Sequence, residues 1–370
     1  MKLVTIIGAR PQFIKAAAVS RAIAEHNKKH VDNPIVETIV HTGQHYDENM
    51  SRIFFDELNI PEPDYNLGVG SGSHGGQTGK MLQVIEAVLV RERPDCCLVY
   101  GDTNSTLAGA LAAAKLHICV AHVEAGLRSF NRKMPEEINR VTTDHISDLL
   151  FCPTKKSAEN LSNEGILSGI HQVGDVMFDC VRFYVKKAKD LECKTLKQLD
   201  IRPGSYYLAT VHRAENTDDS RRLSDIFEAL DEISTSECPV VLPLHPRTVK
   251  YARKHGLNFN NGVKAIQPVP YLEMVVLENN ARLILTDSGG VQKEAYWLNV
   301  PCITLRDETE WSETVESGWN ILVGADKNRI IDSVRDSHRM RDSNVGPLHG
   351  NGDAAERICR ILQGVQSHCV

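Results

Sequence analysis

The sequence predicts an α/β protein with two doubly wound, Rossmann-like domains in series. Short apolar runs that resemble buried strands alternate with helical segments along the whole chain. In addition, 370 residues are too many for one ordinary hydrophobic core. We expect an N-terminal domain over residues 1–171, a second domain over residues 172–352, and a C-terminal helix over residues 353–370 that packs back on the first domain.

The first domain begins with the apolar run LVTIIG, which Gly8 ends, and a helix follows with Pro11 near its start. In the segment 75–94, apolar residues recur at helical spacing. The predicted strands cover residues 3–8, 34–43, 95–102, 118–125 and the end of 137–152. The predicted helices cover residues 11–26, 49–59, 75–94, 105–117 and the start of 137–152.

The alternation restarts after a polar segment at residues 186–205, which we expect to form a surface helix and a loop. The predicted strands of the second domain cover residues 206–212, 239–245, 263–269, 282–287 and 301–306, with helices over 218–235, 271–280 and 291–299. Two such domains in series are expected to face each other across a cleft between the carboxyl ends of their strands.

Composition and charge are those of an ordinary globular protein, with 42% hydrophobic residues and a net charge of -6. A nucleic-acid surface would need a basic stripe, so no nucleic-acid partner is expected. No apolar run reaches the ~18–20 residues that span a bilayer, and the N-terminus does not resemble a signal peptide. We therefore expect a cytoplasmic protein that does not insert into membranes. Its ten cysteines contain no CxxC pair and are expected to be reduced.

Four acidic residues lie close together in the sequence: Asp102, Glu124, Glu136 and Glu137. Each lies in a segment that resembles the end of a buried strand or the loop after it, where open α/β sheets bind ligands. Like charges in a partly dry site push their pKa values apart, so that one carboxyl can act as an acid and another as a base. Each residue alone could be a helix cap or part of a surface ion pair, but together they favour proton transfer.

The segment LTDSGGVQKEA predicts an anion site after a strand that ends at Asp287. Paired glycines, Gly289 and Gly290, let backbone N–H groups approach an anion, and the following helix adds partial positive charge that suits a diphosphate. Glu294 is placed to accept hydrogen bonds from ribose hydroxyls. The alternative is a tight turn in which Ser288 only caps the helix.

Basic residues and histidines follow several other strands. Arg10 and Lys15 follow the first strand without the GxGxxG spacing of a dinucleotide site. His45 follows the second strand. His212 and His245 end two strands of the second domain and could bind a diphosphate or move a proton, although either could be structural. Further polar residues follow the strand 301–306: Arg306, Glu308, Glu310 and Glu313.

Together, these motifs resemble the family of non-hydrolysing UDP-N-acetylglucosamine 2-epimerases. The resemblance covers nearly the whole chain, through the segments GARPQFIK, YGDTNSTLAGALAA, HVEAGLRS, MPEEINR, HRAEN, LHPRT, LTDSGGVQKEA and RDETE in the family's order. It implies a glycosyltransferase-B-like fold whose cleft closes on a UDP-sugar, usually in a homodimer.

The resemblance also implies roles for the residues that match the family's motifs. Asp102, Glu124 and Glu136 correspond to the acid/base set, and His212 to a catalytic-site histidine. The residues expected to bind UDP or the sugar are Arg10, Lys15, His45, Arg128, Arg140, His245, Ser288, Gly289, Gly290, Glu294, Arg306 and Glu310. Neither a metal ion nor another cofactor is expected.

Some segments depart from the common family pattern, and these bear on the substrate. The chain has TEWSE at residues 309–313 where many members have TERPE, and VHRAEN where many have GHRREN. With GARPQFIK and HTGQHYD, these segments are similar to the branch that acts on UDP-2,3-diacetamido-2,3-dideoxyglucuronic acid for surface-polysaccharide synthesis, including lipopolysaccharide O-antigen. Arg128, Arg132 and Lys133 are candidates to bind the uronate carboxylate. UDP-GlcNAc is the alternative substrate, and the departures leave open whether a regulatory UDP-GlcNAc site exists.

The expected reaction inverts C2 of the sugar by anti elimination and readdition of UDP. The C2 proton is not acidic by itself, but loss of UDP from C1 weakens the C2–H bond. The reaction needs a base on one face, an acid on the other, and cations that stabilise the leaving diphosphate. A hydrolysing 2-epimerase, a retaining glycosyltransferase and a non-catalytic UDP-sugar sensor are the alternatives.

Overall fold

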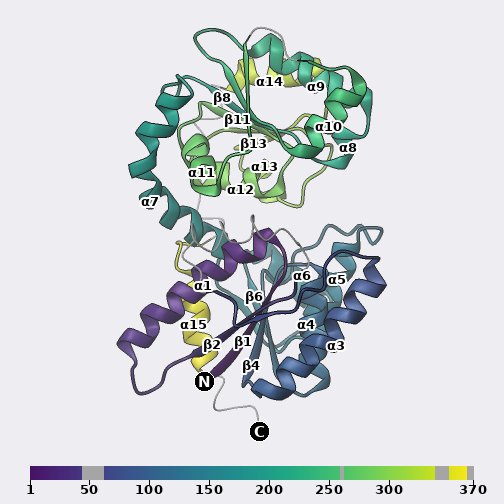
Figure 1. Ribbon diagram of the computed structural model, residues 1–370, viewed down its shortest axis with the longest axis vertical. Coiled ribbons are helices and arrows are strands. Elements are labelled where there is room, and N and C mark those ends of the chain that lie inside the picture. Colours follow the sequence, from purple (N-terminus) through teal and green to yellow (C-terminus); the bar gives the residue numbers. More distant parts are fainter. Residues whose placement is uncertain (44–61, 259–261, 338–349, 365–370) are drawn as a thin grey trace. The chain divides into compact units, whose positions relative to one another are not determined.

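The computed structural model describes residues 1–43, 62–258, 262–337 and 350–364 (Figure 1). The chain forms two compact units, Met1–Cys180 together with His349–Val370, and Val181–Leu348. Each unit contains one parallel sheet, which confirms the predicted class of two doubly wound α/β domains. None of the described helices is long and apolar enough to cross a bilayer. The helix predicted at residues 49–59 lies outside the described residues.

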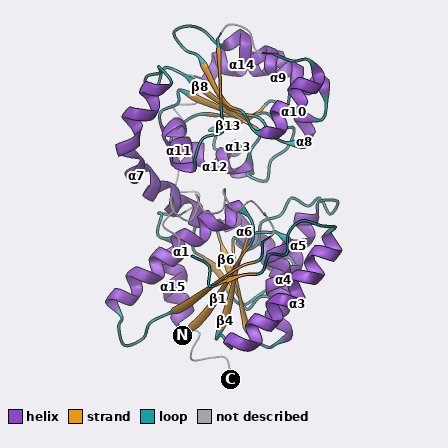
Figure 2. Ribbon diagram, in the orientation of Figure 1, coloured by secondary structure: helices purple, strands orange, loops and turns teal. Residues whose placement is uncertain are grey.

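The first unit has a seven-stranded parallel sheet in the order β3-β2-β1-β4-β5-β6-β7. Its strands are β1 (Lys2–Ile7), β2 (Val36–His41), β3 (Tyr65–Asn66), β4 (Cys96–Tyr100), β5 (Cys119–Val123), β6 (Leu149–Cys152) and β7 (Ile170–Gln172). Its helices are α1 (Arg10–Lys29), α3 (His74–Glu92), α4 (Asn104–Lys115), α5 (Pro135–His145), α6 (Lys155–Asn163) and α15 (Ala354–Gly364). Helices cover both faces of the sheet (Figure 2).

Small residues bring α4 close to the sheet of the first unit. The helix is rich in alanine, and at Gly109 an added Cβ would lie only 3.1 Å from Ile6 Cγ1 and 3.2 Å from Val99 Cγ1. Together with α3, it buries apolar side chains of β1 and β4. Because burial of apolar area is the main stabilising term, this packing fixes α4, and with it the turn between β4 and α4 that contains Asp102.

The second unit has a six-stranded parallel sheet in the order β10-β9-β8-β11-β12-β13. Its strands are β8 (Tyr207–Thr210), β9 (Val240–Pro243), β10 (Val263–Ile266), β11 (Leu283–Thr286), β12 (Cys302–Thr304) and β13 (Asn320–Leu322). Its helices are α8 (Ala214–Thr217), α9 (Ser220–Ile233), α10 (Pro246–His255), α11 (Tyr271–Asn279), α12 (Gly289–Trp297), α13 (Ser312–Glu316) and α14 (Lys327–Asp336). Two apolar clusters bury its two faces.

The division between the units lies later in the chain than the sequence indicated. A boundary after residue 171 falls inside β7, whose pairing with β6 is extended by a hydrogen bond from the Val173 N–H to the Cys152 carbonyl at 3.1 Å. Helix α7 (Val176–Gln198) begins in the first unit, and the division falls within it, after Cys180. The segment 353–364 belongs to the first unit, where α15 packs against α1 (Figure 1).

Candidate active site

The carboxyl ends of β1, β4 and β5 lie side by side in the first sheet. Three predicted site residues meet there: Lys15, Asp102 and Glu124. Gly101, directly after β4, has a φ of +62°. A Cβ at this position would lie 3.2 Å from Lys15 Nζ and 3.3 Å from Glu124 Oε2. Glycine therefore suits the left-handed backbone here, and a larger residue would have to displace the ends of Lys15 and Glu124 slightly. The turn that carries Asp102 is in contact with Lys15 and Glu124.

A pocket of about 260 Å³ opens at this edge of the first sheet. Lys15, Asp102 and Glu136 all line it, as does Asn139 one helical turn after Glu136. The structure thus brings together residues from α1, the turn after β4 and the first turn of α5. Two carboxylates and an ammonium group around one small cavity can take up and deliver protons.

Asp102 is held by Arg140, which the sequence placed in the binding set. Arg140 Nη2 donates to Asp102 Oδ2 at 2.7 Å, and its Nη1 donates to Glu137 Oε2 at 2.6 Å. Burial raises the pKa of Asp102 above its usual range, and the charges of Arg140 and Lys15 oppose that rise. Asp102 can therefore retain a proton at a higher pH than an ordinary aspartate.

Lys15 and Glu124 form an ion pair in which each side chain is 10% exposed. The backbone of Glu124 has a φ of +73°, which is uncommon for a residue other than glycine. Lys15 lowers the pKa of Asp102 and Glu124 raises it. The two members of this ion pair therefore have opposite effects on the pKa of Asp102.

Glu136 and Glu137 are neighbours on α5 but have different surroundings. Glu137 is 1% exposed and accepts hydrogen bonds from the N–H groups of Ser129 and Phe130 at 3.0 and 2.9 Å. Burial acts to raise its pKa, but these bonds and the contact with Arg140 outweigh burial and lower it. Glu136 is exposed at the pocket and makes no hydrogen bond or ion pair within the described part of the chain. Glu137 is structural, and Glu136 is the carboxylate open to a ligand.

Two amide side chains at this site were not singled out from the sequence. Asn139 Nδ2 donates to the Asp102 carbonyl at 2.9 Å. Gln12 accepts from the N–H groups of Gly8 and Ala9 at 2.8 and 2.9 Å, and donates to the Tyr100 carbonyl at 2.7 Å. For Asn139, the available signal was its spacing of three residues from Glu136, which puts both on one face of a helix.

Arg128, predicted to bind the substrate, does not line this pocket. It is 7% exposed, and its guanidinium donates to Asp144 at 2.6 Å and to Glu164 at 2.7 and 2.8 Å. If the Arg128 guanidinium bound a uronate instead, a buried carboxylate would lose its ion-pair partner, which is strongly destabilising. The structure therefore gives Arg128 a role inside the first unit, and we withdraw it as a candidate uronate ligand.

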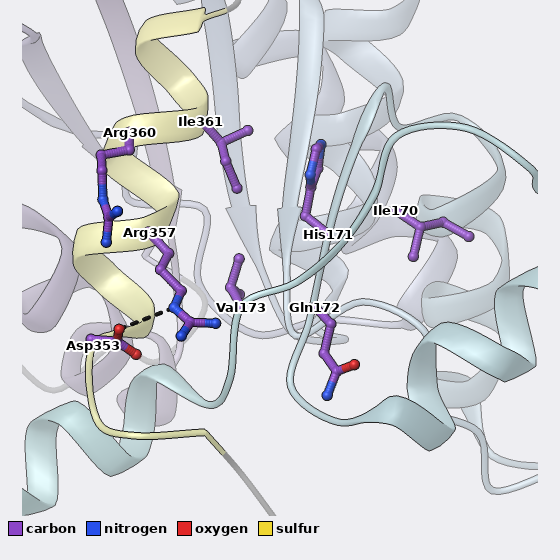
Figure 3. A pocket seen from close by; sticks show the side chains of 8 residues that line it. All are labelled: Ile170, His171, Gln172, Val173, Asp353, Arg357, Arg360 and Ile361. Atoms are coloured by element: carbon purple, nitrogen blue, oxygen red, sulfur yellow. Dashed lines mark hydrogen bonds and ion pairs between the residues drawn. The ribbon is translucent and has the colours of Figure 1, made fainter.

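A larger hollow of about 630 Å³ lies elsewhere on the first unit, between β7 and α15 (Figure 3). His171 and Arg357 are among its lining residues, and Arg357 is paired with Asp353 at 3.0 Å. None of the predicted site residues lines it. We place the candidate chemistry in the smaller pocket because the perturbed carboxyl of Asp102 is there.

In the second unit, His212 and His245 lie at the ends of the adjacent strands β8 and β9, with ring centroids 5.4 Å apart. Asp287, fully buried after β11, accepts the backbone N–H groups of His212 at 3.0 Å and Arg213 at 2.9 Å. Burial lowers the pKa of His212, which favours the neutral ring, and Asp287 opposes this. His245 caps α10 through Nδ1, which accepts the Arg247 N–H at 3.1 Å.

The segment predicted as an anion site forms the turn between β11 and α12, and the Ser288 side chain accepts the Val291 N–H there. Ser288 is the N-cap, and Gly289 and Gly290 begin the helix. A Cβ on Gly289 would lie 2.4 Å from Glu310 Oε1, so the turn is packed against the loop after β12. In that loop, Arg306 donates to Glu310 at 2.9 Å and is 5% exposed. Burial acts to raise the pKa of Glu310, but Arg306 and Arg213 outweigh it and lower that pKa.

Glu294 lies one turn further along α12, where it is 5% exposed. The hydroxyl of Tyr271 donates to Glu294 Oε1 at 2.8 Å. The neighbouring Glu278 is completely buried, and burial together with the charge of Glu294 raises its pKa well above the usual range. Glu294 is thus oriented by α11. His45 and the side chain of Arg10 lie outside the described residues.

Comparisons with known proteins show the family to which the chain belongs. The family model described as UDP-N-acetylglucosamine 2-epimerase matches residues 27–363. The chain belongs to the UDP-N-acetylglucosamine 2-epimerase family. The resemblance found in the sequence is therefore confirmed, and members of this family are isomerases of UDP-sugars.

Two relatives cover nearly the whole chain. A UDP-N-acetylglucosamine 2-epimerase homolog from Methanococcus maripaludis is 55% identical over 99% of this chain and 100% of its own length. The UDP-2,3-diacetamido-2,3-dideoxy-D-glucuronate 2-epimerase of Pseudomonas aeruginosa is 53% identical over 98% of this chain and 99% of its own.

The crystal structure of UDP-GlcNAc 2-epimerase from Methanocaldococcus jannaschii, in complex with UDP-GlcNAc and UDP, is 50% identical to this chain. It matches with a TM-score of 0.86 and covers 98% of this chain and 100% of that one. The expected glycosyltransferase-B-like fold class of this epimerase family is therefore confirmed.

Proposed function

We propose that this epimerase inverts C2 of a UDP-2-acetamido sugar, from the gluco to the manno configuration, without releasing free sugar. The observation that carries the proposal is the pocket in the first unit, where Asp102 and Glu136 lie together with Lys15. One carboxyl is paired with an arginine and has a raised pKa, and the other is exposed and unpaired within the described residues. Two carboxyl groups in different surroundings can serve as acid and base.

The reaction proceeds by anti elimination and readdition of UDP. The C1–O bond to the diphosphate breaks as a base removes the C2 proton, which gives a glycal and UDP. The diphosphate oxygen then bonds to C1 again while an acid delivers a proton to the opposite face of C2. Because C2 ends at the oxidation state at which it began, the reaction balances without a redox cofactor. Asp102 and Glu136 supply the acid and the base in this proposal. Glu124 raises the pKa of Asp102 or takes part in the same proton transfer.

The second unit supplies the features that would hold UDP. The N-terminus of α12 offers backbone N–H groups and partial positive charge at Gly289 and Gly290. Arg306 lies in the loop packed against that turn, and His212 and His245 follow neighbouring strands. Stabilising charge at the leaving diphosphate is what the elimination needs.

For the sugar, we propose UDP-2,3-diacetamido-2,3-dideoxy-D-glucuronate, as a precursor of a surface polysaccharide. The relative from Pseudomonas aeruginosa and the TEWSE segment support this choice. With Arg128 withdrawn, Arg132 and Lys133 are the candidate cations for the C5 carboxylate. Both are exposed in the segment just before α5, the helix that carries Glu136. UDP-GlcNAc is the second candidate, because the relative with that name from Methanocaldococcus jannaschii is 50% identical.

Proton NMR of the purified protein in D₂O tests the proposal, with the two UDP-sugars offered separately. We expect deuterium at C2 and a manno-configured UDP-sugar from the uronate. The same result from UDP-GlcNAc alone would replace the substrate and keep the reaction. Release of free sugar with UDP would make the protein a hydrolysing epimerase, and transfer of the sugar to an acceptor with release of UDP would make it a glycosyltransferase.

The proposed contact with the uronate carboxylate can be tested separately, because only one of the two sugars carries a charge at C5. Replacing either Arg132 or Lys133 with Ala should raise KM for the uronate at least ~10-fold and leave KM for a neutral UDP-sugar within about twofold. Lys155→Ala, an exposed residue on α6, is the charge-matched control. Equal changes in both KM values would exclude these residues as uronate ligands.

We also propose that the protein works as a cytoplasmic homodimer. The cysteine pattern supports the location, because ten cysteines without a CxxC pair are typical of a protein whose thiols stay reduced in the cytoplasm. Exposed apolar side chains of the first unit, such as Phe130 at 74% and Ile138 at 51%, are available for contact with a second copy. Light scattering on a size-exclusion column will give the mass, and a monomer would contradict the assembly.

A further inference from the structure

Buried polar groups behind the pocket connect the two acidic turns. His122 on β5 and Asp144 on α5 are 0% and 1% exposed. His122 Nδ1 lies 2.7 Å from Asp144 Oδ1, and its Nε2 lies 2.7 Å from the Gly101 carbonyl oxygen. The other oxygen of Asp144 accepts the Gly126 N–H at 3.1 Å. One strand and one helix thus hold the backbone of both turns.

The two turns have backbone conformations that need such support. Gly101, just before Asp102, has a φ of +62°, and Gly126 has a φ of +78°. Glu124 itself is at +73°, a conformation in which a side chain strains the backbone. A strained turn keeps its shape only if the surrounding groups fix it. The contacts of His122 and Asp144 fall on Gly101, directly before Asp102, and on Gly126, two residues after Glu124.

The charges explain why a histidine occupies this position. The Gly101 carbonyl can only accept, and the Asp144 carboxylate accepts from Arg128 as well, at 2.6 Å. Burial acts to raise the pKa of Asp144, but His122 and Arg128 outweigh burial and lower it, so Asp144 is ionised. A ring that satisfies both acceptors donates from both nitrogens and carries a positive charge. The positive charge of His122 offsets the negative charge of Asp144, and the negative charge of Glu164 offsets the positive charge of Arg128.

We propose that His122 and Asp144 are positioning residues of the epimerase, which hold the turns of Asp102 and Glu124 so that Asp102 lies where proton transfer at C2 requires it. Neither residue lines the pocket, so neither is expected to touch the substrate. The inference rests on the proposed function. A misplacement of about 1 Å at a reacting group can lower a rate ~10²-fold, so the loss should appear in kcat more than in KM.

Two amide substitutions test the two hydrogen bonds of the His122 ring one at a time. The amide nitrogen of Gln can reach the place of Nε2 and keep the bond to Gly101, whereas that of Asn reaches only the place of Nδ1 and keeps Asp144. We expect His122→Asn to lower kcat ~10²-fold and His122→Gln less than ~10-fold, with KM within about threefold for both. Val88→Ala, on the buried face of α3, is the control for a general loss of stability.

A second readout does not depend on turnover. Amide and side-chain NMR of protein labelled with ¹⁵N in His, Asp and Gly reports the backbone at Gly101 and Asp102 and the protonation of both His122 nitrogens. We expect two protonated ring nitrogens in the wild type. The Gly101 and Asp102 resonances should move in His122→Asn and stay near their wild-type positions in His122→Gln.

Each outcome decides one question. Equal kcat values for the two amide variants, or losses that follow melting temperature as in Val88→Ala, would overturn the positioning role. Unmoved Gly101 and Asp102 resonances in His122→Asn would overturn it as well. If the wild type fails to exchange the C2 proton of either UDP-sugar, the proposed function falls, and the NMR comparison still shows whether His122 holds the turn.

Discussion

Replacing Arg140 with Met tests how the site stabilises its carboxylates. The guanidinium joins Asp102 and Glu137, whose side chains are 33% and 2% exposed, and is itself 11% exposed. Removing one partner of a buried ion pair costs ~3–5 kcal/mol. Glu137 keeps the donors from Ser129 and Phe130, and Asp102 remains partly in water. We therefore expect the lower end of that range, about 3 kcal/mol of unfolding free energy.

The same substitution should move the pH dependence of turnover in one direction. Arg140 lowers the pKa of Asp102, so its removal raises that pKa further above the usual range. If Asp102 must be ionised to accept a proton, the acidic limb of the kcat profile moves to higher pH. If Asp102 must be protonated to donate, the alkaline limb moves to higher pH. Both roles predict an upward shift.

Urea unfolding at pH 7 and a pH profile of kcat measure the two effects. Arg140→Lys keeps a charge beside Asp102 and should shift the profile less. Arg357→Met is the matched control, because its pair with Asp353 is 38% and 32% exposed and should change stability by no more than about 0.5 kcal/mol. A loss below about 1 kcal/mol in Arg140→Met, or a limb that stays in place or moves to lower pH, would refute the reasoning.

Three further predictions follow from the same contacts. Gly289→Ala should weaken UDP binding ~10-fold in calorimetry, since its Cβ would lie 2.4 Å from a carboxylate oxygen of the adjacent loop, and Gly79→Ala, where the space is open, should leave affinity unchanged. Burial raises the pKa of Asp179 to about 6, so its protonated form favours the folded state. Unfolding free energy should then fall by about 2 kcal/mol between pH 4 and 6, and Asp179→Asn should remove this slope in urea titrations; an unchanged slope would exclude Asp179 as its source. Asp102→Asn and Glu136→Gln should each lower kcat ~10²-fold or more with UDP affinity kept, and near-normal turnover would remove that residue from the acid/base set.

The sequence by itself determined the fold class and the family, and it indicated the edge where the site lies. Apolar runs of strand length alternating with helical spacing are a local signal, and they are sufficient for a doubly wound sheet. Because parallel strands end at one edge, the residues that follow β4 and β5 had to come near each other. For that reason Asp102 and Glu124 lie near each other in the structure, and Gly289 begins a helix directly after β11.

The sequence did not separate the two adjacent glutamates by their surroundings. Glu136 and Glu137 differ by about 100° around a helix, and only the packing of α5 decides that the first faces the pocket and the second is buried. Family resemblance favoured Glu136, but the physical difference between them is the set of donors that Ser129, Phe130 and Arg140 present to Glu137.

Charge partners and the limits of the units were decided by tertiary structure alone. Arg128 meets Asp144 and Glu164, which are 16 and 36 residues away, so no local pattern could show that its charge was already used. The division inside α7 likewise depends on contacts between distant segments. Sequence patterns report the period of each element, whereas ion pairs and unit boundaries depend on which elements meet when the chain is packed.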